Sequence, residues 1–467
     1  MSKGKQFISL LMTLTIVFSM FFSMHTEAAP NSKQDTSQTT SSAGGKGSKK
    51  KVTDSPVAEE PAPAPTPTET STETAPSAPT DPIPTPEQVT TETFSYTVKS
   101  GDTLYLIAKT YNTTVETIKT LNNLITDMIY VGQVLLIPIT NVQSQEVVNT
   151  KPLILGYYTK YWSNDLTSYQ SLTENYDMIN SIATASLDVN ADGTIAGYLP
   201  TEAVSFSNQN NITTYATIQN RFDPALTNII LSNQVLRQTV IQNMLKLVQD
   251  NQYKGINIDF ENMYAADRAL FNQFLSEVSQ VFRAQNLPMM VSVPAKTGDF
   301  PTWAWSGTFD YNYIGQVADY VQIMTYDQHG QWGEPGPVSG LNWVENVLSF
   351  ARTSSIPSNK ILIGLPAYGY DWNVTLGSGH KAVTYKQIKA LIAAQQPVIK
   401  FDTTSQSPYF NYVDSNGNSH VVWFENNESI IAKTNLVSKY GLAGVSVWRM
   451  GQEDRTFWES IYSVLGR

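Results

Sequence analysis

The chain has 467 residues, of which 41% are hydrophobic and 11% aromatic, so it is long and apolar enough for more than one folded domain. Its 30 basic residues face 40 acidic ones, and the resulting net charge of −10 argues against nucleic acid or an anionic membrane surface as a partner. The sequence contains no cysteine, which excludes disulfide cross-links.

Residues 1–29 have the pattern of a secretory signal. Two lysines precede an apolar run from Phe7 to Phe22, and Thr26-Glu-Ala28 supplies the small residues of a cleavage site. We expect cleavage after Ala28, because the run is shorter than the roughly 17 to 25 residues that span a bilayer. The pattern therefore predicts secretion without a membrane anchor, and an uncleaved anchor is the alternative.

Residues 30–92 are rich in Ser, Thr, Pro, Lys and Glu and contain almost no large apolar side chain. Such a segment buries too little surface to offset the entropy lost on ordering, so we predict a disordered linker. Its basic end, from Lys46 to Lys51, either binds anionic polymers or keeps the linker soluble.

Residues 93–140 predict a compact unit with the order strand, helix, helix, strand. Tyr96-Thr-Val98 alternates as in a strand, and Gly132-Gln-Val-Leu-Leu-Ile-Pro138 closes the unit as a second strand. Thr113, followed by Glu116, indicates a capping box at the start of the second helix. The first helix is indicated by apolar residues at helical spacing: Leu104, Ile107, Ala108 and Tyr111.

The string Tyr96-Thr-Val-Lys-Ser-Gly-Asp-Thr-Leu104, the later Asn122-Asn-Leu124 and the closing strand together resemble a LysM domain over its whole usual length. The resemblance implies binding to N-acetylglucosamine in peptidoglycan or chitin, through the loops after the first strand and before the last. Spacing alone predicts only a small α+β domain.

From residue 151 to 467, short apolar runs alternate with helical patterns, which indicates βα units and a parallel sheet. Amphipathic helices are predicted at 239–248 and 270–282. We expect an α/β fold, a (β/α)8 TIM barrel, with a small α+β insertion at about 373–440 between strands seven and eight. The eight expected strands are 153–158, 178–183, 228–231, 255–261, 289–293, 320–326, 361–368 and 444–448.

The strand Gly255-Ile-Asn-Ile-Asp-Phe-Glu261 carries the candidate chemistry. Its alternation places Asn257, Asp259 and Glu261 on one face, which in a barrel faces the axis. Polar side chains at the carboxyl end of a barrel strand favour an active site. Carboxylates this close resist ionising together, so one keeps a proton, as a general acid requires. They are also too close to flank a sugar as acid and nucleophile, so the nucleophile must come from elsewhere.

This strand resembles the DxxDxDxE signature of glycoside hydrolase family 18, and the similarity extends over residues 151–467. Met324-Thr-Tyr-Asp327 matches the family's sixth strand, Trp448 its eighth and Gly156-Tyr-Tyr158 its first. The resemblance implies a retaining hydrolase of β-1,4-linked 2-acetamido sugars. In that mechanism the substrate's own N-acetyl oxygen attacks the anomeric carbon, so no protein nucleophile is needed.

The resemblance also assigns roles to individual residues. Glu261 is the acid and then the base, Asp259 orients the acetamido group, and Tyr326 donates a hydrogen bond to its carbonyl oxygen. The residues expected to contact the substrate are Asn257, Asp327, Trp448, Met324 and Tyr158.

The sequence departs from the signature at its first two positions, which are Lys254 and Asn257. Asn257 can donate a hydrogen bond to Asp259 but cannot share a proton with it, which favours an ionised Asp259. The form Gly-Ile-Asn-Ile-Asp-Phe-Glu261, together with Trp423-Phe-Glu-Asn and the run from Gly441 to Trp448, resembles the LysM-bearing N-acetylglucosaminidases that degrade spore-cortex peptidoglycan.

The sequence therefore predicts a secreted peptidoglycan hydrolase, an N-acetylglucosaminidase, that acts at the cell wall or spore envelope as a monomer. Its expected partner is peptidoglycan or a chitin-like polysaccharide. A chitinase is one alternative, and a noncatalytic wall-binding lectin is another. The presence of Glu261, Asp259 and Tyr326 argues against the lectin.

Several other residues have two readings. Glu425 either reaches a bound sugar or makes a structural hydrogen bond. The histidines at positions 329, 380 and 420 lack ligand spacing, so we expect no metal site and no cofactor. Four tryptophans near strand ends either stack on sugars or pack internally: Trp303, Trp305, Trp332 and Trp372.

Overall fold

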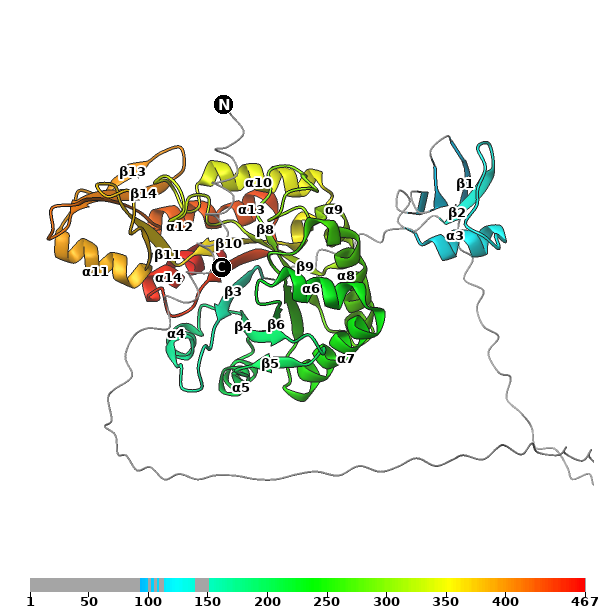
Figure 1. Cartoon of the computed structure of the whole chain (residues 1–467), viewed down its shortest axis with the longest axis horizontal. Helices are drawn as coiled ribbons and strands as arrows, with labels where there is room; N and C mark the ends of the chain where they lie inside the picture. The colour runs from blue at the N-terminus through cyan, green and yellow to red at the C-terminus, as the bar shows by residue number, and fades with distance from the viewer. Residues whose placement is uncertain (1–92, 100–101, 105–106, 109–112, 139–150, 467) are drawn as a thin grey trace, which may run out of the picture. The chain divides into compact units, whose positions relative to one another are not determined.

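The computed structural model describes residues 93–99, 102–104, 107–108, 113–138 and 151–466. The predicted signal and linker lie outside these residues, as does Tyr111. The described residues form a small N-terminal unit and a large C-terminal one (Figure 1). In the described part of the chain, no helix is both long and apolar enough to cross a membrane.

In the small unit, β1 (Thr93–Thr97) pairs antiparallel with β2 (Val134–Pro138), and α3 (Val115–Asn122) packs on them. Asn122 fastens this helix to β2, because its amide donates to the carbonyl of Leu136 at 2.7 Å and accepts from the Leu136 N–H at 2.6 Å. The cap of α3 is Thr114, which accepts from the N–H of Thr117, so the predicted cap lies one residue too early. The core consists of Val98, Leu104, Ile107, Ala108, Ile118, Leu135 and Ile137.

The large unit is a closed barrel of eight parallel strands, which confirms the predicted TIM barrel. A short strand, β5 (Ile195–Gly197), pairs antiparallel with the end of β4. The barrel strands are β3 (Leu153–Tyr158), β4 (Ser181–Val189), β6 (Thr213–Gln219), β7 (Gly255–Asp259), β8 (Met289–Pro294), β9 (Tyr320–Met324), β10 (Ile361–Pro366) and β16 (Gly444–Trp448).

Helices surround this barrel (Figure 1). The predicted segments 239–248 and 270–282 lie within α7 and α8, whose apolar faces pack in the core between strands and helices. The helices of this layer are α4 (Thr167–Asn175), α5 (Thr201–Gln209), α6 (Pro224–Ser232), α7 (Gln234–Asp250), α8 (Arg268–Arg283), α9 (Tyr311–Val317), α10 (Leu341–Thr353), α12 (Asn427–Thr434), α13 (Leu436–Tyr440) and α14 (Arg455–Leu465), with 3-10 turns at Ala265–Asp267 and Ser358–Lys360.

The predicted third strand was wrong. Residues 228–231 lie inside α6, where Asp223 caps the first turn and Pro224 occupies its first position. The third strand is β6, whose sequence Thr-Thr-Tyr-Ala-Thr-Ile-Gln is buried on both faces and so lacks an apolar alternation. A short apolar run cannot by itself distinguish a buried strand from a helix segment.

The insertion between the seventh and eighth strands is a five-stranded antiparallel sheet with α11 (Tyr385–Gln395) packed on it (Figure 1). This sheet spans residues 368–423, whereas the predicted bounds were about 373–440. It begins earlier because only Ala367 separates β10 from β11, and it ends earlier because α12 and α13 pack in the barrel core. Its strands are β11 (Tyr368–Asn373), β12 (Lys381–Thr384), β13 (Lys400–Asp402), β14 (Ser407–Val413) and β15 (Ser419–Trp423).

Candidate functional site

The polar face of β7 leads to the carboxyl end of the barrel. The alternate residues Ile256, Ile258 and Phe260 are fully buried in the core beneath the helices. On the axial face, Asp259 is 5% exposed, and Glu261 just beyond the strand is partly exposed. Exposure therefore increases toward the strand end, which makes Glu261 accessible to a substrate.

Both carboxyl groups have raised pKa values. Burial raises the pKa of Asp259 to about 6, although hydrogen bonds from Ser292 and Gln219 lower it in part. The Gln219 amide nitrogen lies 3.2 Å from the Asp259 Oδ2. Burial raises the pKa of Glu261 well above its usual range, and the charges of Asp259 and Asp327 raise it further. Glu261 therefore keeps a proton at pH values where an exposed glutamate is ionised.

Asn257 lies beneath the carboxyl groups and is fully buried. It therefore does not reach a substrate, contrary to the expectation from the sequence. Its amide donates to the hydroxyl oxygens of Tyr157, Thr217 and Ser292, at 3.3, 3.3 and 3.1 Å, rather than to Asp259. Since Ser292 is itself a hydrogen-bond partner of Asp259, Asn257 acts on the carboxyl group through Ser292. The expected direct stabilisation of an ionised Asp259 is not what the structure shows.

Tyr326 and Asp327 follow β9 and lie near this pair. Burial raises the pKa of the Tyr326 phenol well above its usual range, and the charges of Asp259 and Glu261 contribute to the rise. Tyr326 therefore remains a neutral hydrogen-bond donor.

Asp327 is exposed as a residue, but its carboxyl group is enclosed beside Tyr368 and Tyr370. Its backbone is left-handed, with a φ of 61°. Its Oδ1 accepts hydrogen bonds from the hydroxyls of Tyr368 at 2.6 Å and Tyr370 at 2.8 Å. Burial of the carboxyl group raises its pKa, and these two hydrogen bonds oppose the rise. The first strand of the insertion thus holds an acidic residue at the mouth of the barrel.

Trp448 ends β16 and packs edge-on against Tyr157, with 5.4 Å between ring centroids. It remains partly exposed, as does Met324 at the end of β9, so both are accessible to a substrate. Tyr158, by contrast, is fully buried in the outer core and does not join the site. Its neighbour Tyr157 takes the axial position, because successive residues of a strand point to opposite faces.

Asn220 is a site residue that the sequence interpretation missed. It follows β6 and is 1% exposed. Its side-chain oxygen accepts from the N–H of Glu261 at 2.9 Å, and its amide nitrogen donates to the Glu261 carbonyl at 2.7 Å. Asn262 completes the connection by donating to the carbonyl of Phe222 at 2.8 Å. The misplaced third strand concealed Asn220, since correct placement of β6 puts it at a strand end.

The other candidates separate into buried and exposed groups. Trp372 is fully buried and donates to two backbone carbonyls, and Glu425 forms a buried ion pair with Lys433 at 2.7 Å. Both are structural. Trp303, Trp305 and Trp332 are about half exposed, at 58%, 44% and 45%. Within the described residues no cluster of acids and histidines has the arrangement of a metal site.

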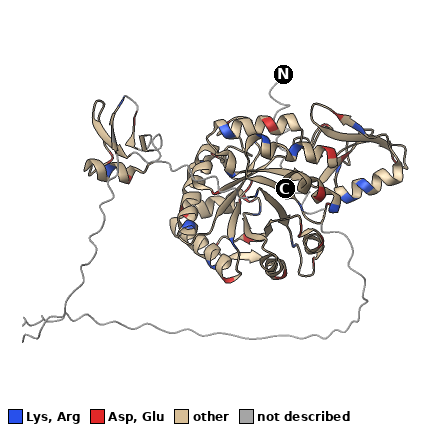
Figure 2. Ribbon diagram, turned by 180° about the vertical axis from the view of Figure 1, so that it is seen from behind, with Lys and Arg blue, Asp and Glu red and all other residues tan. Residues whose placement is uncertain are grey.

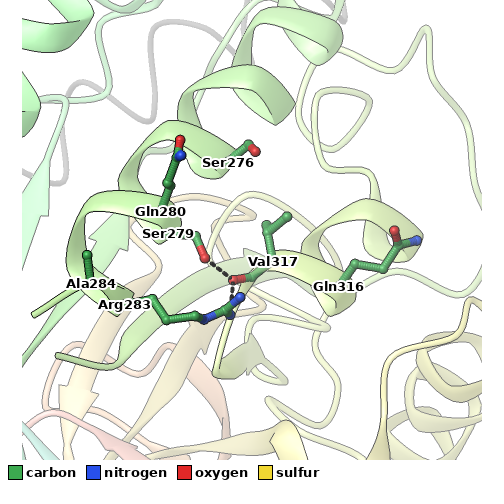
Figure 3. Close-up of a pocket in the computed structure, with 7 residues that line it drawn as sticks. All are labelled: Ser276, Ser279, Gln280, Arg283, Ala284, Gln316 and Val317. Atoms are coloured by element: carbon green, nitrogen blue, oxygen red, sulfur yellow. Dashed lines mark hydrogen bonds between the residues drawn. The ribbon is translucent and has the colours of Figure 1, made fainter. Parts of the chain in front are cut away.

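A shallow pocket also lies between α8 and α9 (Figure 3). There Ser279 and Arg283 both donate to the carbonyl of Val317, at 2.7 and 3.4 Å. The pocket lining contains neither a carboxylate nor an aromatic ring, so it lacks the groups needed to hydrolyse a glycoside.

Comparison with known proteins agrees with this geometry. Residues 153–453 match the model of glycosyl hydrolases family 18, and residues 96–138 match the LysM domain. The uncharacterized glycosylase YvbX of Bacillus subtilis is 39% identical over 312 residues, which are 66% of this chain and 90% of that protein.

Two solved structures are also similar. The Bacillus cereus spore cortex-lytic enzyme SleL has a TM-score of 0.64 and 29% identity, covering 79% of this chain and 86% of that one. A chitinase from Chromobacterium violaceum has a TM-score of 0.63 and 32% identity, covering 68% of this chain and 99% of that one. The resemblances to family 18 and to LysM are thereby confirmed.

Proposed function

Because the chain belongs to glycosyl hydrolase family 18, we propose that it is an N-acetylglucosaminidase that cleaves β-1,4 bonds of peptidoglycan with retention of configuration. The observation that supports this most strongly is the partly exposed Glu261, with its raised pKa, two residues beyond the buried Asp259 that ends β7. A carboxyl pair this close does not leave room for a sugar between acid and nucleophile. The substrate's acetamido oxygen takes the nucleophile's place.

In the first step, Glu261 donates its proton to the glycosidic oxygen while the acetamido oxygen attacks the anomeric carbon, so the glycosidic bond breaks and an oxazolinium ion forms. Asp259 lies against the acetamido nitrogen and stabilises its positive charge. Tyr326 donates to the acetamido oxygen. In the second step, the Glu261 carboxylate removes a proton from a water molecule while the water oxygen attacks the anomeric carbon. The bond from that carbon to the acetamido oxygen breaks, which opens the oxazolinium ring, regenerates the acetamido group and restores the acid.

Substrate contacts at the mouth of the barrel come from exposed groups at several strand ends. Trp448 provides an apolar floor for the reacting sugar, and Asp327 accepts hydrogen bonds from its hydroxyls. Met324, which is partly exposed at the end of β9, provides a further apolar contact. The LysM unit binds the same polymer and keeps the enzyme on an insoluble substrate.

Two substrates fit this site, because chitin and peptidoglycan both present a 2-acetamido sugar. Similarity to the spore cortex-lytic enzyme favours peptidoglycan, and similarity to the chitinase supports chitin as the second candidate. Purified spore-cortex peptidoglycan and chitin oligomers are digested separately, and the products are identified by mass spectrometry. Fragments ending in reducing N-acetylglucosamine from peptidoglycan support the proposal, and release from chitin alone refutes it.

The digest is repeated with a test variant and a matched control variant, both of which change a glutamate to glutamine. Glu261→Gln removes the proton donor, so it should release no fragments above background. Glu459→Gln changes an exposed glutamate on the outer helix α14 and should retain wild-type rates. Full activity of Glu261→Gln would instead assign the acid to another residue.

We further propose that the protein is exported and acts as a monomer at the cell wall or spore envelope. The secretory pattern at residues 1–29 and the similarity to a spore cortex-lytic enzyme support this location. Fractionation of sporulating cells and size-exclusion chromatography test the two statements. Deletion of residues 94–139 should weaken hydrolysis of insoluble wall more than hydrolysis of soluble fragments, and equal loss on both would contradict a targeting role.

A further inference from the structure

The loops that follow β16 and β3 meet at the carboxyl end of the barrel, where Arg449 stands next to Trp448. The Arg449 Nη1 donates to the Thr159 Oγ1 at 2.9 Å. The guanidinium also lies over the ring of Tyr161, 5.1 Å from its centroid. Trp162 is 48% exposed, and its ring lies 6.4 Å from that of Tyr161. A cation and two aromatic rings therefore gather beside the proposed floor of the site.

Arg449 differs from most arginines of the chain in having no acidic partner. In the part of the chain that the structure describes, only Arg352 and Arg449 lack a carboxylate within 4.0 Å. Arg352 is exposed on α10 and lies over Tyr440. Figure 2 shows basic and acidic residues interspersed over the outer helices. An exposed arginine there, such as Arg352, is hydrated by water and needs no acidic partner. Arg449 is only partly exposed, so its charge loses part of its hydration without gaining an ion pair.

The charged neighbours of Arg449 leave its charge available. Lys160, which follows Thr159, is paired with Glu202 and so adds no net charge. Asp165 is buried and accepts from the backbone N–H groups of Tyr161 and Thr167, at 3.2 and 3.1 Å. Its carboxylate is thereby occupied by backbone donors. The guanidinium is fixed by one hydrogen bond and one ring. Its other N–H groups have no hydrogen-bond partner among the residues that the structure describes, so they can bind an anion.

We propose that Arg449, Tyr161 and Trp162 form a subsite for a carboxylate-bearing sugar of the glycan strand. A guanidinium binds a carboxylate through two parallel hydrogen bonds, and aromatic rings pack against the apolar face of a sugar. This subsite rests on the proposed function, because the muramic acid of peptidoglycan carries a lactyl group and the sugars of chitin carry none. The lactyl carboxyl group is an amide where a peptide is attached and a free carboxylate where the peptide has been removed. The subsite therefore gives the enzyme a preference for glycan strands whose peptides have been removed, over both peptide-bearing strands and chitin.

The test compares two substrates that differ at the lactyl group, which is negatively charged in one and neutral in the other. Peptidoglycan glycan strands are stripped of their peptides, which leaves the lactyl carboxylates free, and half of the sample is converted to neutral methylamides. We expect the wild-type enzyme to prefer the free carboxylate at least tenfold in kcat/KM, and the preference should shrink as salt is added. Arg449→Gln should reduce the preference to near unity, and Arg449→Lys should restore it only in part.

Arg352→Gln is the matched control, because it removes the other arginine that has no acidic partner and should keep the wild-type preference. Equal loss on both substrates in Arg449→Gln would overturn the subsite, since it indicates a structural role. A wild-type enzyme without any preference would overturn it as well. If the enzyme cleaves chitin oligomers but neither the free-carboxylate nor the methylamide form of the peptidoglycan strands, the proposed function itself fails, and the subsite fails with it.

Discussion

Replacing Asn220 by alanine should weaken catalysis without touching the proposed acid itself. The change removes both hydrogen bonds to the Glu261 backbone, at 2.9 and 2.7 Å, and a third to the Thr227 hydroxyl at 2.7 Å. A buried polar group left without a partner costs about 1–3 kcal/mol, so two backbone groups cost about 2–6 kcal/mol if the loop does not rearrange. If the loop relaxes, Glu261 moves and part of this free-energy cost is avoided. A displacement of the catalytic carboxyl group by about 1 Å lowers the catalytic rate roughly a hundredfold.

We therefore expect Asn220→Ala to lower kcat by about tenfold to a hundredfold, with a smaller change in KM and a lower Tm. Steady-state kinetics on a soluble glycan and a thermal melt measure these quantities. Asn220→Asp keeps an acceptor for the Glu261 N–H and adds a negative charge, which should raise the pKa of Glu261 and move the alkaline limb of the pH profile upward.

The control for Asn220→Ala is Asn243→Ala on the outer helix α7, which removes a 2.8 Å hydrogen bond to the carbonyl of Gly193. It should lower Tm and leave kcat unchanged. If Asn220→Ala also lowers Tm but keeps the wild-type kcat and pH profile, Asn220 supports the fold and does not position the acid.

Three further outcomes follow from the same geometry. Glu261→Gln should abolish turnover while the protein still sediments with insoluble peptidoglycan, because the LysM unit is unchanged; loss of sedimentation would contradict this. Burial raises the pKa of Asp259 from 3.8 to about 6, so the folded state binds this proton more tightly than the unfolded state. The free energy of unfolding should therefore fall as the pH rises from about 4 to 6. Thermal melts of Asp259→Asn should show a smaller decrease, because only the raised pKa of Glu261 then contributes to it. Gly364→Ala places a Cβ 2.6 Å from the Tyr326 Cε1, so it should lower kcat, whereas Gly333→Ala, with no atom within 4 Å of its added Cβ, should not.

The barrel and its acidic strand could be predicted because both depend on local patterns. Buried parallel strands appear as short apolar runs, and the polar face of β7 stands out against Ile256, Ile258 and Phe260. Tyr158 was misassigned for a different reason. A motif match identifies the segment from Gly156 to Tyr158, but only the register of the sheet decides which tyrosine faces the axis. A shift of one residue exchanges the axial and the outward-facing side chain.

Side-chain partners that come from distant strands were beyond prediction. Asn220 lies 41 positions before Glu261, and Tyr368 lies 41 positions after Asp327, so no local spacing links either pair. The same holds for the raised pKa of Asp259, since burial is its main cause and burial depends on the whole barrel. The sequence could identify the two carboxyl groups, but the fold determines their protonation.

Asn257 shows how the structure changes the meaning of a substitution. In place of the acid of the family signature, its amide joins a chain of neutral groups across the barrel interior: Ser292, Tyr157, Gln322 and Ser446. These groups donate and accept hydrogen bonds but do not ionise near neutral pH, and burial raises the pKa of Tyr157 further. Asp259 therefore has no carboxylate beneath it to exchange a proton with. Asp259 can exchange its proton only with Glu261 and the substrate. The pH dependence of the site should therefore follow the coupled titration of Asp259 and Glu261, with Asp327 as the neighbouring charge.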